Sequence, residues 1–206
     1  MNSQLWWYVA RSGGIVAWAL LAASVLWGLA LSTKVLRGRP RPNWILDLHR
    51  FLGGMALLFT GIHVASLIAD SYVHFGLVEV LVPFTGSWHP VAVAWGVIGL
   101  YLLAAVELTS LLRKRISKRL WRMTHYLSFP LFFLTTVHAL TAGTDRSTFL
   151  LRACVAVVCA LVTALTFIRV NKSDHHDLLT SPAVSRTQGN NGDRSEDRPR
   201  QLLDHV

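Results

Sequence analysis

The sequence predicts an all-α integral membrane protein, a helix bundle with about five transmembrane helices. Of its 206 residues, 52% are hydrophobic and only 15% are charged. The chain also contains five apolar runs close to the ~20 residues that a helix needs to cross the hydrocarbon layer. These runs are residues 13–33, 51–69, 90–112, 126–142 and 148–168.

The first apolar run follows Arg11 and could be mistaken for a signal peptide. It is as long as a full span and lacks a convincing small-residue cleavage site, so we expect it to be the first helix. The third run carries Glu107 near its end and the fifth carries Arg152 near its start, where a charged side chain can reach the interface. The fourth contains Pro130, which we expect to bend the helix.

Basic residues alternate between the connections and predict the orientation of the chain. Connections 70–89 and 143–147 contain Arg146 as their only Lys or Arg. Positive charge marks the cytoplasmic side, so residues 1–12 are predicted to be a short extracytoplasmic N-terminus and the C-terminus to be cytoplasmic in the plasma (inner) membrane. The net charge of +9 then indicates orientation and contact with anionic lipid, not nucleic-acid binding. The other two connections contain Lys34, Arg37, Arg39, Arg41 and Arg50, and Arg113, Lys114, Arg115, Lys118, Arg119 and Arg122.

The segment 171–206 is polar, and we expect it to be a disordered cytoplasmic tail. It is too short for a flavin or nicotinamide domain, and the chain has no Gly-rich turn of the dinucleotide-binding type. We therefore expect flavin or quinone to act only through a partner.

Four histidines lie in or beside the second and fourth apolar runs. Ionisable groups at membrane depth are rare and usually functional. His63 follows His49 by 14 residues, and His138 follows His125 by 13. Because both spans run in the same direction, His49 and His125 share one depth, and His63 and His138 share another about 20 Å away.

Each depth-matched pair could supply both axial ligands of one non-covalent b-type haem between the second and fourth helices. His49 and His125 would bind the inner haem iron, and His63 and His138 the outer one. On an ideal helix a 14-residue spacing keeps two side chains within about 40°, whereas a 13-residue spacing leaves them about 140° apart. We expect the Pro130 kink to reorient His138, with His125 in a frayed first turn.

Other residues near the predicted haems have two interpretations each. Arg50 and Arg122 flank the inner histidines and could pair with haem propionates or simply anchor the inner face. The connection 70–89, with Asp70, His74 and His89, could cap the outer haem and receive an acceptor, or could be a solvated or interfacial loop.

Two stretches, Asn43 to His63 and Arg119 to Asp145, resemble the ferric reductase-like transmembrane domain. That domain is shared by NADPH oxidases, ferric reductases and the bacterial haem-binding subunit of methionine sulfoxide reductase, and the likeness covers roughly residues 14–170. The resemblance implies a transmembrane haem domain, residues 13–170, with bis-histidine ligation of two b haems at His49, His63, His125 and His138. It also implies outward electron flow in the haem-binding membrane component of an oxidoreductase.

Three functions remain open at this point. The leading one is a dihaem transmembrane electron carrier that takes electrons from a cytoplasmic flavoprotein or quinol and delivers them to an unknown outer acceptor. The second is a quinone-linked cytochrome b subunit of a respiratory complex. The third, a non-redox metal or proton transporter, ranks last because transporters usually show repeated halves and broken helices near the midplane.

Overall fold

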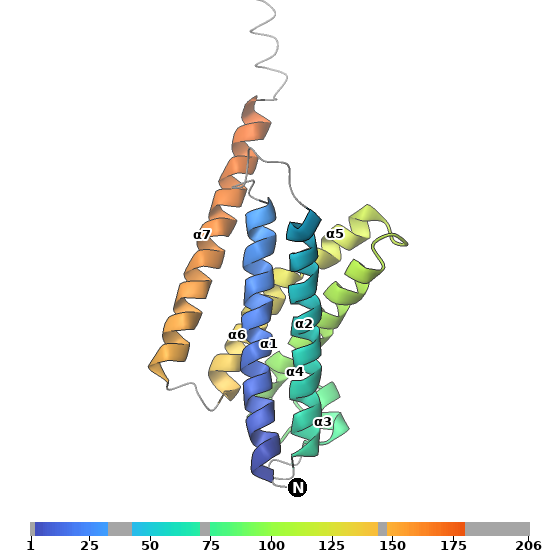
Figure 1. Ribbon diagram of the computed structural model, residues 1–206, viewed down its shortest axis with the longest axis vertical. Coiled ribbons are helices and arrows are strands. Elements are labelled where there is room, and N and C mark those ends of the chain that lie inside the picture. The colour runs from blue at the N-terminus through green and yellow to red at the C-terminus, as the bar shows by residue number, and fades with distance from the viewer. Residues whose placement is uncertain (1–2, 33–42, 71–74, 144–147, 180–206) are drawn as a thin grey trace, which may run out of the picture. The chain divides into compact units, whose positions relative to one another are not determined.

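A computed structural model describes residues 3–32, 43–70, 75–143 and 148–179 of the chain (Figure 1). The chain divides into two compact units, Met1–Leu165 and Thr166–Val206. Of the second unit, the structure describes only the last part of one helix, so the architecture below is that of the first unit. In the described ranges, all regular secondary structure is α-helical, which confirms the predicted all-α class.

The first two helices form an antiparallel pair. α1 covers Ser3–Ser32 and α2 covers Asn43–Ala69, and both begin before the predicted spans 13–33 and 51–69. The Trp27 indole donates a hydrogen bond to the Ile45 carbonyl oxygen (3.0 Å) where α1 ends and α2 begins. The earlier starts follow from helix propagation, since each residue added to an existing helix gains a backbone hydrogen bond.

A short helix precedes the third long one. α3 covers Leu77–Leu81 and α4 covers Pro90–Leu111. Pro90 occupies the first turn of α4, where the missing N–H would have no helical partner. The Tyr101 hydroxyl of α4 donates to the Leu81 carbonyl oxygen at 2.6 Å, which ties α3 to α4.

The predicted fourth span, 126–142, is interrupted at Leu127. α5 covers Lys118–Tyr126, and α6 covers Ser128–Ala142. α5 has no buried residue, whereas α6 packs against α1 and α4 and buries Leu131. The 15 residues of α6 rise about 22 Å, which is shorter than the hydrocarbon layer.

The last helix, α7, covers Phe149–Leu179. It extends past the predicted end at residue 168, so the start of the predicted tail 171–206 is helical, and the rest of the tail lies outside the described residues. Propagation from a long apolar helix explains this extension into polar sequence.

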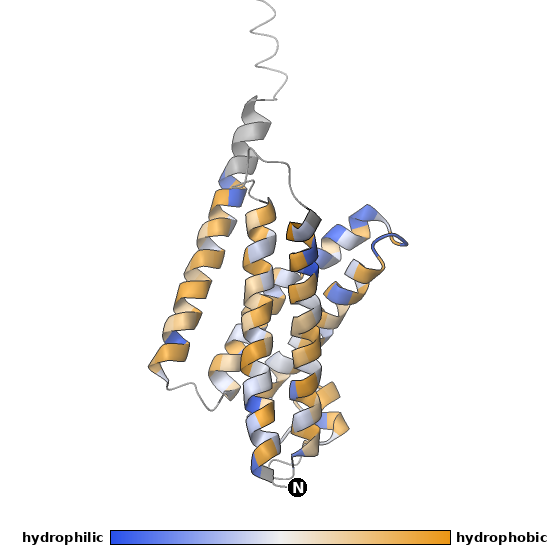
Figure 2. Ribbon diagram, viewed as in Figure 1, coloured by the Kyte–Doolittle hydropathy of each residue, from blue (hydrophilic) through white to orange (hydrophobic). Residues whose placement is uncertain are grey.

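Four described helices are long and apolar enough to cross a membrane, not the five predicted. Figure 2 shows that hydrophobic residues cover these helices, while hydrophilic residues gather near helix ends and in the turn between α4 and α5. Many large apolar side chains stay exposed, as expected of a surface that faces lipid. The chain is therefore a multi-pass membrane protein, and its candidate spans by length and hydropathy are Gln4–Ser32, Trp44–Ala69, Pro90–Leu111 and Phe149–Asn171.

One buried cluster joins α1, α2, α4, α6 and the part of α7 within the first unit. A side chain-to-side chain hydrogen bond runs from the Trp18 indole in this cluster to the Thr136 hydroxyl at 3.0 Å. The cluster's member on α2, Ala56, is midway along the chain between His49 and His63. Its buried members are Trp18, Leu21, Ala22, Val25, Leu29, Ala56, Leu103, Leu131, Phe132, Val155 and Val162.

Candidate functional site

The structure brings the four histidines together as two facing pairs. The rings of His49 on α2 and His125 on α5 have centroids 6.0 Å apart and planes 77° apart. The rings of His63 on α2 and His138 on α6 have centroids 6.4 Å apart and planes 74° apart. The two pairs are separated by the length of α2 between His49 and His63, about 20 Å.

Backbone carbonyls hold both rings of the His63–His138 pair. The Nδ1 atom of His63 lies 2.6 Å from the Ala10 carbonyl oxygen, and the Nδ1 atom of His138 lies 2.8 Å from the Ala92 carbonyl oxygen. A carbonyl oxygen only accepts, so Nδ1 carries the proton and Nε2 keeps its lone pair. Such a bond to a carbonyl fixes the orientation and tautomer of many metal-binding histidines.

The ring of His49 contacts a backbone carbonyl of α1 in a similar way. Its Nδ1 atom lies 3.1 Å from the Ser24 carbonyl oxygen and 3.3 Å from the Ser24 hydroxyl. Both histidines of α2 therefore face α1, as a 14-residue spacing on one helix predicts. Their Nε2 atoms are left for the partner ring or a ligand between the rings.

His125 lies in the last turn of α5 and is positioned differently. Its ring stacks on Trp121, with centroids 5.1 Å apart and planes 20° apart. The Arg113 guanidinium lies over the Trp121 ring at 4.5 Å. Ser117 is the N-cap of α5, and its side chain accepts a hydrogen bond from the Leu120 backbone N–H (3.2 Å).

A change of helix at Leu127 explains how His125 and His138 can both face histidines of α2, although a 13-residue spacing on one continuous helix would set them about 140° apart. Pro130 has no N–H for the Tyr126 carbonyl, and its ring would clash with that carbonyl in a continuous helix. α5 accordingly ends at Tyr126, and the Leu127 N–H bonds to the Thr124 carbonyl (3.0 Å) in a tighter turn. The bend was predicted at Pro130, and His125 was expected in a frayed first turn; the structure has the break at Leu127 and His125 at the end of α5.

A cavity of about 250 Å³ adjoins the His63–His138 pair. Its walls come from α1, α2, α4, α6 and α7, and from the connection 70–89. That connection contributes Asp70, which is only 4% exposed, together with Phe75, Val80 and Trp88. The connection thus contributes to the wall of the cavity. His74 lies outside the described residues, and His89 is exposed at the start of α4.

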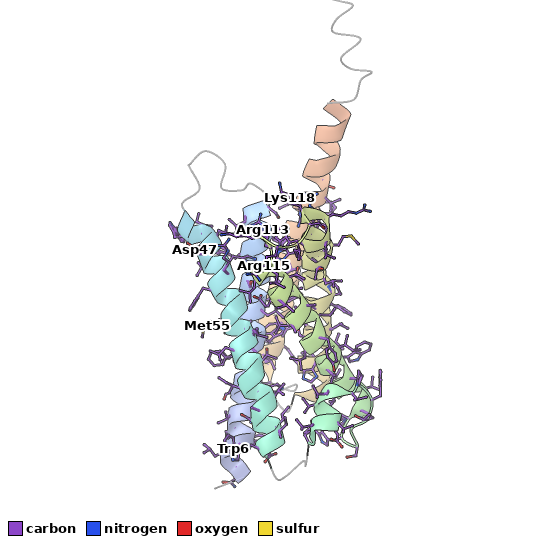
Figure 3. All side chains as sticks on the ribbon, turned by 90° about the vertical axis from the view of Figure 1, so that its right-hand side faces the viewer. Trp6, Asp47, Met55, Arg113, Arg115 and Lys118 are labelled. Carbon is purple, nitrogen blue, oxygen red and sulfur yellow. The ribbon has the colours of Figure 1, made fainter. Side chains whose placement is uncertain are left out.

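The two arginines predicted near the inner histidines lie on the surface. Arg50 forms an ion pair with Asp47 (3.3 Å), and both side chains are more than half exposed. Arg122 is also exposed on α5. Figure 3 shows Arg113, Arg115 and Lys118 near the end of the bundle where Asp47 lies, with Trp6 at the other end.

Sequence reasoning missed several residues that contact the histidines. Trp121 stacks on His125, and Gly14, Gly28 and Gly96 lie against the rings of His63, His49 and His138, respectively. One signal could have revealed two of the glycines: Gly14 and Gly28 are spaced by 14 residues, like His49 and His63 on the antiparallel neighbour. Within the described ranges, no cluster of three or more His, Cys, Asp and Glu side chains occurs.

The chain matches one known protein family. The family model for the ferric reductase like transmembrane component matches residues 13–136, which is more than half of the chain. The match contains His49, His63 and His125 and ends two residues before His138. No curated protein and no solved structure matches the chain significantly. With its helical bundle of membrane-spanning segments and this match, the chain belongs to the family of ferric reductase-like transmembrane components.

Proposed function

We propose that the chain is a dihaem b-type electron-transfer protein that carries electrons from a cytoplasmic donor to an acceptor on the outer side. The observation that carries this proposal is the pair of facing imidazoles at each of two depths. Their ring centroids lie 6.0 and 6.4 Å apart. Family membership supports electron transfer across the membrane as the general activity.

The spacing of the rings fits one metal ion between each pair. Imidazole nitrogens bind such metals at about 2 Å, which puts the centroids of two rings on opposite sides of one ion about 6.3 Å apart. The hydrogen bonds of His63 and His138 through Nδ1 leave Nε2 as the ligand atom. His63 and His138 would hold one haem iron, and His49 and His125 would hold the other.

When bound, haem iron supplies one-electron transfer between its ferric and ferrous states. The protein residues hold the ligands and exclude water. Ala56 and Leu131 are almost fully buried between the two histidine depths, and Phe132 is 6% exposed. This packed apolar layer keeps ions and water away from the path between the two pairs.

The direction of transfer follows from the distribution of charge. Arg113, Arg115 and Lys118 lie in the turn between α4 and α5 and in α5, at the same end as His49 and His125. Positive charge marks the cytoplasmic side of a membrane protein, so electrons enter at the His49–His125 pair. A flavoprotein with an acidic face would dock there, and Arg50 and Arg122 are available for haem propionates or for that partner.

The exit lies at the His63–His138 pair. Arg11, Trp7 and Trp88 line the cavity beside it, together with buried Asp70. A cavity of this kind, apolar with a few polar groups, is typical of small-molecule sites. Because His63 and His138 themselves line this cavity, it would hold the outer haem, and an outer acceptor would approach that haem from the same end of the chain.

Vesicle reconstitution tests this function. The full chain is reconstituted in liposomes with ferricyanide trapped inside, and an external flavin reductase with NADH is compared with an external quinol. We expect the flavoprotein to reduce the haems and then the trapped ferricyanide. Protein-free liposomes and His63→Ala, which lacks an outer ligand, should not reduce it.

Two results would contradict the proposal. If the haems are reduced but the trapped ferricyanide is not, the chain does not carry electrons across the bilayer. If only the quinol reduces the haems, the chain is instead a quinone-linked cytochrome b subunit.

A further inference from the structure

One arrangement of carbonyl and glycine recurs around three of the four histidines. At His63, the Nδ1 atom lies 2.6 Å from the Ala10 carbonyl oxygen of α1. Four residues after Ala10 comes Gly14, and a Cβ atom at Gly14 would lie 3.0 Å from the same Nδ1. The His63 ring therefore rests against a residue that has no side chain.

The arrangement repeats where His49 contacts α1, about four turns further along that helix. The His49 Nδ1 lies 3.1 Å from the Ser24 carbonyl oxygen, and Gly28 follows Ser24 by four residues. A Cβ atom at Gly28 would lie 3.1 Å from the His49 Cε1 atom. Gly28 and Gly14 are thus matched to His49 and His63 on the neighbouring antiparallel helix.

It repeats again on a different helix, at His138. The Nδ1 atom lies 2.8 Å from the Ala92 carbonyl oxygen of α4, and Gly96 follows Ala92 by four residues. A Cβ atom at Gly96 would lie 2.7, 2.8 and 3.0 Å from three ring atoms. This is the tightest of the three contacts.

Helix geometry explains why glycine stands four residues after the acceptor. A helical carbonyl at position i already accepts the N–H of residue i+4, and its oxygen has a second lone pair. The Cα–Cβ bond of residue i+4 leans back toward the helix N-terminus and so covers that oxygen. Without a Cβ atom, the second lone pair is open to a side chain from another helix.

We propose that Gly14, Gly28 and Gly96 are positioning residues, each opening a helix carbonyl to a histidine Nδ1–H and thereby fixing the direction of that ring's Nε2. The proposal rests on the proposed function, in which Nε2 binds a haem iron. It assigns Gly28 to the inner haem and Gly14 and Gly96 to the outer haem. The carbonyl bond sets the ring angle about the iron–nitrogen bond and raises the basicity of the ligand.

Close helix packing alone is a competing explanation for these glycines, and the chain contains matched controls. Gly13 lies beside Gly14, and its Cβ would contact the His63 backbone at an ordinary 3.5 Å. Cβ atoms at Gly54 and Gly61 of α2 would meet nothing within 4 Å. Alanine at these three positions tests packing and helix propensity without touching a ring.

The test uses the purified full chain with its haems. Low-temperature electron paramagnetic resonance of the oxidised protein reports the angle between the two imidazoles of each low-spin haem, and a redox titration gives the two midpoint potentials. We expect Gly28→Ala to shift the low-spin signal and potential of one haem. Gly14→Ala should shift those of the other, and Gly96→Ala should cause the greatest change, up to loss of that haem's low-spin signal.

The outcomes separate this inference from the proposed function. Gly13→Ala, Gly54→Ala and Gly61→Ala should keep both signals and both potentials of the wild type. If the wild type holds two haems and the ring-facing variants match these controls, the positioning role is wrong and the proposed function stands. If the wild type holds no haem, both are overturned. Should Gly96→Ala fail to assemble, Gly28→Ala, with the mildest contact, still decides the question.

Discussion

The imidazole of His125 stacks on the indole of Trp121, with ring centroids 5.1 Å apart and planes 20° apart. The two residues are one helical turn apart on α5, and α5 has no buried residue to fix it in place. The stack therefore orients His125 from within its own short helix. Arg113, over the Trp121 ring at 4.5 Å, ties that helix to the start of the turn that follows α4.

Replacing Trp121 should affect one haem only. In Trp121→Ala, His125 loses its stacking surface, and we expect the inner haem to be weakly held while the outer haem stays. Trp121→Phe keeps an aromatic face and should retain most of the inner haem. Haem content and the low-spin signals of both variants check this, and equal loss of both haems in Trp121→Ala would contradict a local role.

Double substitutions test the pairing of the histidines. We expect His49→Ala to lower the haem-to-protein ratio from about two to about one, and His49→Ala with His125→Ala to lower it no further, because both ligands serve one iron. His49→Ala with His138→Ala should remove both haems. A haemochrome assay on the purified variants measures the haem-to-protein ratio. If the variant with both His49→Ala and His138→Ala retains one haem, the assignment of histidines to the two haems is wrong.

The hydrogen bond from Trp18 to Thr136 should stabilise the layer between the pairs. Thr136→Val removes the acceptor of the buried indole N–H, and we expect a loss of roughly 1 kcal/mol in the free energy of unfolding. Thr141→Val is the matched control, since each threonine also bonds the carbonyl four residues earlier in α6. Unfolding in mixed detergent measures both variants, and equal losses would mean that the Trp18 bond contributes nothing.

Restoring a backbone N–H at Pro130 should disturb the histidines on either side. In Pro130→Ala, the Tyr126 carbonyl can bond within a continuous helix, which would turn His125 and His138 toward the ideal angle of about 140°. We expect lower occupancy of at least one haem. Pro90→Ala, at a helix start where no N–H is needed, should keep both. Two haems with wild-type spectra in Pro130→Ala would contradict this explanation of the break.

Much of this arrangement could be predicted from the sequence because apolar run length and histidine spacing are local, periodic signals. They gave the helical membrane class and the pairing of His49 with His125 and of His63 with His138 that the ring distances show. The predicted helix starts are too late, because a helix can extend beyond its apolar part into polar residues such as Asn43 and Asp47.

The break at Leu127 and the glycine contacts could not be predicted from a single sequence. The break depends on which backbone hydrogen bonds form where α5 meets α6. Pro130, Thr124 and the packing of α6 together determine these bonds. The role of Gly96 depends on which α4 carbonyl faces His138, and this is set by how α4 and α6 pack. Both are tertiary properties that spacing along the chain does not contain.

The haem content of the wild-type protein tests the central claim most directly. The full chain is purified in detergent, and its oxidised and dithionite-reduced spectra are recorded with a haem-to-protein ratio. Two facing imidazole pairs predict a ratio near two and the spectrum of low-spin b-type haem with two histidine ligands. A protein that folds, remains in the membrane and contains no b-type haem would contradict the account.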